Sequence, residues 1–247
     1  MPESSALTYL VNSLLQGIEV RLFESLGASY PKAVADATAI NSAFAMELLI
    51  AALMIAFFIF VRMTLSVEKP NPAQQLAEMV HEFVGGQAEQ IIGDHYRTFQ
   101  AYVTCIGVFI LLNNLVGLIP GLKSPTTMIQ VTLGLALPTF FYYNYYGVKT
   151  QGPIGYLKHF AGPIWWMSWL VFPIECFSHL ARILSLSVRL YANMFAGDLV
   201  TLVFFSMCPV IVPAVFLVFH FAISFIQAFV FMLLTMIYLS LATAHEH

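Results

Sequence analysis

The sequence LSLSVRLYANMFAGD, residues 184–198, places one arginine, Arg189, in the middle of a long apolar segment. A guanidinium stays protonated in a protein. At the centre of a bilayer it costs from about 3 kcal/mol on insertion scales to more than about 10 kcal/mol in simulations. Because intramembrane charges usually mark ion paths, this stretch predicts both a membrane helix and a functional residue.

The composition is that of an integral membrane protein. Of the 247 residues, 60% are hydrophobic and only 9% are charged, whereas soluble domains carry about 25% charged residues. The apolar runs are long enough for helices and do not alternate as barrel strands would. The sequence has no basic patch for nucleic acid, and its three cysteines lack metal-ligand spacing. We therefore expect no nucleic-acid partner, no metal site and no other cofactor.

The apolar runs predict an all-α polytopic membrane protein with about five membrane helices. Three runs of ordinary length each fit a bilayer about 30 Å thick, at about residues 43–61, 101–119 and 127–146. Two longer runs follow, at residues 163–207 and 209–242, which would measure about 67 and 51 Å as straight helices. Either each long run kinks into shorter pieces, or the two form a long, strongly tilted hairpin at about residues 163–242. We expect the hairpin.

Two other segments are amphipathic. Residues 5–29 have apolar side chains at helical spacing, so we assign residues 1–40 to an N-terminal extramembrane or interfacial segment and residues 41–247 to the membrane domain. A second helix should begin at Asn71-Pro72, with Gln74 in the place that a capping box gives to Glu or Gln. We expect this helix to lie on the membrane surface and to be interrupted at Gly85-Gly86. Its apolar face comprises Leu76, Met79, Val80, Phe83, Ile91 and Ile92.

The loop charges predict an orientation. Five basic residues fall on one side of the five-span arrangement, namely Arg62, Lys69, Arg97, Lys149 and Lys158. Three fall on the other side, namely Arg21, Lys32 and Lys123. The positive-inside rule then places the N-terminus outside and the C-terminus in the cytoplasm.

A helical wheel at about 100° per residue gives the first long run a polar stripe around Arg189. The residues within about 40° of Arg189 are Glu175, Ser178, Arg182, Ser185 and Asn193. His179 lies at about 80°, and Asp198 lies close to 180°, on the opposite face. A band of small residues flanks the arginine and would let another helix approach closely: Ala181, Ser185, Ala192 and Ala196.

The second long run has a weaker polar face, which carries His220, Ser224, Gln227 and Tyr238. These groups could simply pair with one another inside a helical bundle, and for isolated Ser, Thr or Asn side chains that interpretation is favoured. Two arginines, one glutamate and one aspartate in a single apolar segment favour an ion path.

At this point the residues resemble a known family. The run from Leu186 to Leu199, followed later by Gln227-Ala228-Phe229-Val230-Phe231 and by Tyr238-Leu239, closely resembles bacterial subunit a of the F-type ATP synthase membrane sector. The turn at residues 113–120 and the helix beginning at Pro72 also fit. The resemblance covers about residues 45–247 and leaves residues 1–40 out.

The resemblance implies a role for each matching residue. Arg189 matches the essential arginine that faces the ring of c subunits, and Asn193 matches the asparagine one turn further on. Asp198 matches a half-channel carboxylate that is usually Glu in relatives, so its contact with the partner position, His220, is left open.

The remaining positions follow in the same way. Gln227 matches a glutamine near the essential arginine, and Glu175 matches an acidic residue of the other half-channel. Arg182, His179 and Ser185 are further candidates, because they lie on or near the same polar stripe.

The resemblance implies a proton-translocating stator subunit in the bacterial inner membrane, with two offset half-channels. Its partners would be the c ring, the b-subunit peripheral stalk, the lipid bilayer and protons, with Na⁺ left open as an alternative ion. The chain has no Gly-x-x-x-x-Gly-Lys-Ser/Thr motif, so we expect no catalysis by this subunit itself. The alternative is a secondary ion-coupled transporter, which predicts paired inverted repeats that the sequence does not show.

Overall fold

The computed structural model describes residues 42–93, 95–119, 124–152, 155, 168–207 and 211–243, and every regular element in these ranges is helical. The elements are α3 (Ser42–Met63), α4 (Pro72–Ile92), α5 (Tyr96–Val116), the short 3-10 helix η1 (Pro125–Thr127), α6 (Ile129–Gln151), α8 (Ser168–Met207) and α9 (Ile211–Thr243). The predicted all-α polytopic membrane fold is confirmed. The segment expected at residues 5–29 and the boundary at residue 40 lie outside the described residues.

Among the described helices, four are long and apolar enough to cross a membrane, namely α3, α5, α8 and α9. α6 occupies the place of the third expected span, and it has 23 residues. It is less apolar than the other four because it carries Asn144 and a series of tyrosines. Four of the five expected spans therefore correspond to helices that are apolar enough to cross a membrane, and α6 stands where the third span is expected.

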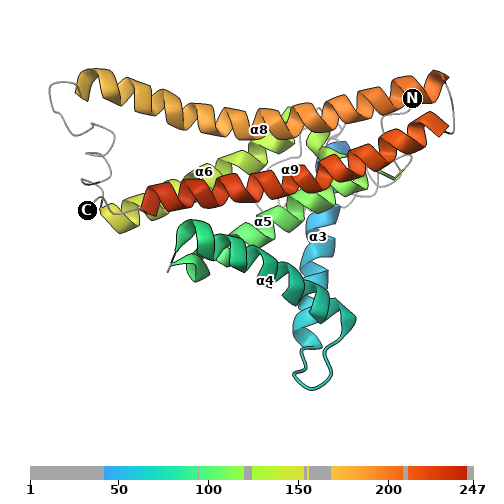
Figure 1. Cartoon of the computed structure of the whole chain (residues 1–247), viewed down its shortest axis with the longest axis horizontal. Helices are drawn as coiled ribbons and strands as arrows, with labels where there is room; N and C mark the ends of the chain where they lie inside the picture. The colour runs from blue at the N-terminus through green and yellow to red at the C-terminus, as the bar shows by residue number, and fades with distance from the viewer. Residues whose placement is uncertain are drawn as a thin grey trace, which may run out of the picture. The chain divides into compact units, whose positions relative to one another are not determined.

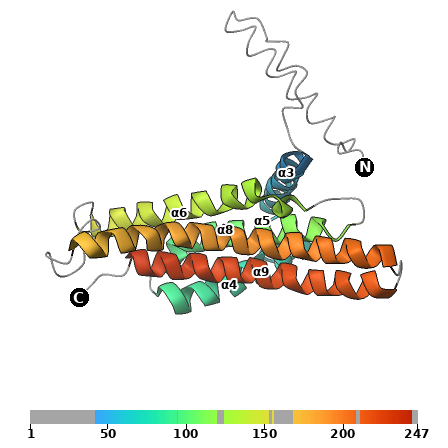
Figure 2. The same cartoon turned by 90° about the horizontal axis from the view of Figure 1, so that it is seen from above.

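The described parts of the two long runs form two unbroken helices that lie side by side (Figures 1 and 2). α8 has 40 residues and α9 has 33, so their lengths are about 60 and 50 Å. α8 continues through Pro173, close to its first turn. Neither helix divides into shorter pieces, which leaves the hairpin of the two alternatives. The connection at residues 208–210 lies outside the described residues.

The unit Phe58–His247 contains α4 to α9. In it α6 packs against α8, α5 packs against α9, and α4 packs against both α5 and α9. Where α4, α5, α6 and α9 meet, a buried cluster contains Phe99, Tyr143, Met236 and Leu239. At this end the Gln151 amide donates to the backbone carbonyl of Ala242, 3.2 Å away. The C-terminal ends of α6 and α9 therefore lie together.

α4 differs from the sequence expectation in two ways. The helix is not interrupted at Gly85-Gly86. Gly85 instead gives the side chain of Gln100 on α5 room to approach the α4 backbone. Asn71 makes no side-chain cap, and Gln74 instead accepts from the Ser66 amide at 3.1 Å. Of the predicted apolar face, Val80, Ile91 and Ile92 pack against the buried cluster, and Leu76, Met79 and Phe83 are exposed.

Candidate functional site

Arg189 lies at the middle of α8 with its side chain exposed. Its Nη2 is 3.5 Å from the hydroxyl of Ser185, one turn earlier. The flanking small residues Ala181, Ala192 and Ala196 are exposed as well. Among the described residues no carboxylate lies within ion-pair distance of this guanidinium. The arginine is therefore presented on a smooth, open helix face.

Asn193, one turn after Arg189, connects the two long helices. Its amide donates to Oε1 of Gln227 on α9 over 2.8 Å. Gln227 is only 3% exposed whereas Asn193 is exposed, so the bond is made at the edge of the contact between the helices. A buried amide that is hydrogen-bonded in this way holds the register of the hairpin beside Arg189.

Asp198 and His220 meet on the C-terminal side of Arg189. The Oδ1 of Asp198 lies 3.8 Å from Nδ1 of His220. The sequence leaves the contact between these two residues open, and the structure brings their side chains close together. His220 is 4% exposed, and its Nε2 has no hydrogen-bond partner among the described residues. Gly197 makes room for the ring, because a Cβ there would lie 2.8 Å from Nδ1 of His220.

A second polar cluster lies toward the N-terminal end of α8. Oε1 of Glu175 is 3.6 Å from Nε2 of His179 and 3.9 Å from Nη2 of Arg182. The guanidinium of Arg182 lies 5.5 Å from the ring centre of Tyr238 on α9, in cation–π range. Nδ1 of His179 is 3.1 Å from the hydroxyl of Tyr143 on α6. Three helices thus contribute to this cluster.

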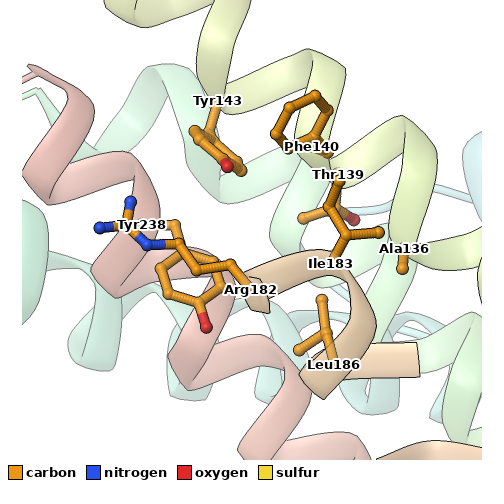
Figure 3. Close-up of a pocket in the computed structure, with 8 residues that line it drawn as sticks. All are labelled: Ala136, Thr139, Phe140, Tyr143, Arg182, Ile183, Leu186 and Tyr238. Atoms are coloured by element: carbon orange, nitrogen blue, oxygen red, sulfur yellow. The ribbon is translucent and has the colours of Figure 1, made fainter. Parts of the chain in front are cut away.

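This second cluster opens onto two cavities. A cavity of about 90 Å³ is lined by Glu175, His179, Arg182, Tyr143 and Gln151, together with the end of α9. Tyr143 and Arg182 also line a cavity of about 10 Å³ between α6, α8 and α9 (Figure 3). The smaller cavity is about the size of one water molecule, and the larger one can hold several.

The two clusters lie on opposite sides of Arg189 along α8. At 1.5 Å per residue, Glu175 lies about 21 Å from Arg189 along the helix axis and Asp198 about 13 Å in the other direction. The residues of the polar stripe also differ in their exposure along α8. Glu175 and Arg182 are half-buried, whereas Ser185, Arg189 and Asn193 are exposed.

Comparison with known proteins gives the family. A family model described as ATP synthase A chain matches residues 44–240. The chain belongs to the ATP synthase A chain family. It is similar over its whole length, at 47% identity over 247 residues, to ATP synthase subunit a of Koribacter versatilis, all of which is covered. It is 46% identical over 202 residues to ATP synthase subunit a of Solibacter usitatus, which covers 82% of this chain and 87% of the relative.

Membership of the ATP synthase A chain family confirms the resemblance read from residues 186–199. It places the chain in the membrane sector of an ATP synthase, in keeping with its apolar helices. It gives no support to the alternative of a secondary transporter. Among the described residues no group of three or more His, Cys, Asp or Glu side chains is placed to hold a metal ion.

Tyr143 is the residue of this site that sequence reasoning missed. It carries no charge and stands in an aromatic run of α6, and it touches a histidine 36 positions away. Neither periodicity nor the helical wheel of α8 holds a signal for such a contact. The other candidates fall into the groups described above, and Arg189 lies between them.

Proposed function

We propose that this ATP synthase A chain family member is the proton-conducting stator subunit of an F-type ATP synthase, with Arg189 facing the ring of c subunits. The single observation that supports this most is the position of Arg189. It is exposed on a membrane helix, small residues flank it, and no carboxylate of the described residues pairs with it. A permanent cation in that position requires an anionic partner from another subunit.

The two polar clusters would be the two half-channels. Asp198 and His220 would line one, and Glu175 with His179 and Arg182 would line the other. Their separation along α8 supports this assignment, because half-channels that joined would let protons cross without turning the rotor. Arg189 stands between them and repels a hydrated proton that would pass directly from one to the other.

Each c subunit would carry one carboxylate through a cycle of two states. While it faces lipid, the apolar surroundings favour the neutral acid. Near Arg189 the opposite charge favours the carboxylate, so the proton leaves into one half-channel. A proton from the other half-channel then neutralises the carboxylate again. The membrane potential supplies about 2.3 kcal/mol per charge per 100 mV, and rotation transmits this energy to the catalytic subunits, since the chain itself catalyses no reaction.

The side of the membrane to which each polar cluster opens is inferred from the end of the helical bundle at which Glu175 lies. The cavity beside Glu175 is also lined by Gln151, in the last turn of α6 together with Lys149. By the positive-inside rule this end faces the cytoplasm, as does the end of α9. The Glu175 cluster would then open to the cytoplasm and the Asp198 cluster to the outside of the bacterial inner membrane.

The partners can be tested directly. We expect the tagged chain, extracted in mild detergent, to purify with a ring of small apolar c subunits and with the b-subunit stalk. A cysteine in place of Ala192 should crosslink to a c subunit, whereas a cysteine in place of Phe141, which is 65% exposed on α6, should not. A chain that purifies alone and carries out solute uptake would overturn the proposal. The translocated ion, H⁺ or Na⁺, is set by the c-ring carboxylate site.

A further inference from the structure

Tyr143 occupies a place that packing alone does not require. It is 2% exposed, and its ring contacts those of Phe140 and Tyr238 at centroid distances of 5.4 and 5.8 Å. Those contacts need only an aromatic ring. The hydroxyl makes a further contact, with Nδ1 of His179 at 3.1 Å. Tyr143 is also one of the residues that line both cavities. Figure 3 shows this hydroxyl directed toward the space between the labelled side chains.

A hydroxyl suits this contact because it both donates and accepts. When His179 is neutral with its proton on Nε2, Nδ1 accepts from Tyr143. When His179 is protonated, its Nδ1–H donates to the Tyr143 oxygen. The ring therefore keeps the same orientation in both states, with Nε2 directed at Glu175, 3.6 Å away. The partner of one ring nitrogen determines what the other can do.

The distance between His179 and Glu175 leaves a role for water. At 3.6 Å the two atoms are just beyond hydrogen-bond range and too close for a water to lie between them, so a water that bridges them would lie beside the contact, in the cavity. Both residues line the cavity of about 90 Å³. A histidine held in one orientation keeps such a water-filled path continuous, and a rotated ring interrupts it.

We propose that Tyr143 is a positioning residue for proton conduction, which acts by holding the imidazole of His179 toward Glu175 and the larger cavity. The inference rests on the proposed function, since it takes Glu175 to belong to a half-channel. The Tyr143 hydroxyl rotates between donating and accepting, and it neither gains nor loses a proton. Within the described part of the chain, the titratable and charged groups nearest the histidine are Tyr143 from α6 and Glu175 and Arg182 from α8. Tyr238 from α9 contacts the ring of Tyr143 and the guanidinium of Arg182.

The test is a double-mutant cycle on passive proton conduction, measured over a range of pH in membrane vesicles stripped of the catalytic subunits. Tyr143→Phe keeps the ring and removes the hydroxyl, and we expect conduction to fall about three- to tenfold, as the loss of one hydrogen bond to a working group implies. His179→Gln should lower conduction at least as much and change its pH profile. The double variant should match His179→Gln, because Tyr143 acts only through the histidine. Tyr145→Phe, at a position 61% exposed on the same helix, should conduct as the parent does.

Two outcomes overturn the inference. One is a Tyr143→Phe complex that conducts as the parent does at every pH. The other is a double variant whose loss is the product of the two single losses. If Tyr143→Phe does not assemble, 3-fluorotyrosine at position 143 preserves the packing and makes the hydroxyl more acidic, and an unchanged pH profile would then overturn it. Glu175→Gln separates the two proposals: normal conduction in that variant contradicts the half-channel itself, whereas impaired conduction there with a normal Tyr143→Phe contradicts only the role of Tyr143.

Discussion

Arg189 owes its importance to a charge that burial cannot remove. A lysine placed in an apolar site can lose its proton, whereas a guanidinium stays cationic. It also offers several N–H donors in a rigid plane, which suits a carboxylate that approaches from the side of the helix. The neighbouring Ser185 hydroxyl takes up one donor at 3.5 Å and leaves the others for a partner. Charge and geometry together favour arginine at this position.

Replacing Arg189 by alanine should abolish ATP-driven proton pumping while the complex still assembles. The side chain is exposed, so its loss opens no cavity in the bundle, but nothing then favours the ionised rotor carboxylate. Pumping is measured as acidification of inverted vesicles, and assembly as recovery of all subunits. Arg62→Ala, which removes an exposed charge in the last turn of α3, is the matched control and should pump normally. Coupled pumping in the Arg189→Ala complex would contradict the proposed role.

Asp198 and His220 should behave as one functional unit. Their side chains approach within 3.8 Å. When two residues act together, the loss of activity in the double variant is far smaller than the product of the two single losses. We expect Asp198→Ala and His220→Ala each to slow proton conduction by roughly a hundredfold, the low end for a positioned proton-transfer group. The double variant should be no slower than the worse single variant. Fully multiplicative losses would instead place the two residues on independent paths.

At the scale of elements, the adjacent glycines of α4 should differ sharply. A methyl group at Gly85 would overlap Nε2 of Gln100, which donates to the carbonyl of His81 over 2.8 Å. At Gly86 a methyl group meets nothing within 4 Å. We expect Gly85→Ala to lower the free energy of unfolding by about 1–3 kcal/mol, as overpacking does. Gly86→Ala should raise it by up to about 1 kcal/mol, because alanine favours helix. Denaturation in mixed detergent micelles measures both, and equal effects would contradict the assigned contact.

Sequence periodicity could predict the features that are set within a single helix, namely its extent and which residues share a face. The long apolar runs gave α8 and α9, and the helical wheel put Asp198 opposite Arg189 because both lie on the same helix. It could not predict what depends on a neighbour. From sequence alone the Gly85-Gly86 pair predicts a break, since only the approach of Gln100 reveals why a glycine is needed there. Tyr143 was missed for the same reason, because its polar partner comes from another helix.

The length of the two helices in the hairpin constrains how the hairpin is tilted in the bilayer. α8 has 40 residues and so measures about 60 Å, twice the hydrocarbon thickness of about 30 Å. Large apolar side chains are exposed along nearly its whole length, from Trp169 to Val203. An upright helix would push about half of them into water. A large tilt away from the bilayer normal keeps them in lipid. It also places Arg189 close to the midplane, with the two polar clusters nearer to opposite surfaces.

The tilt predicts how depth in the membrane changes along α8. If the helix fits its full length into the hydrocarbon region, depth changes by only about 0.75 Å per residue, compared with about 1.4 Å at an ordinary tilt of about 20°. Single cysteines at the exposed positions Leu170, Phe177, Leu184, Phe195 and Val203, labelled with a fluorophore in the assembled complex, would report depth through quenching by lipids brominated at different carbons. We expect a shallow, continuous gradient that passes through the bilayer centre near Arg189. Labels on α5, which has 21 residues, should show the steeper gradient of an ordinary span. A steep gradient in α8, with both ends in water, would contradict the tilted hairpin.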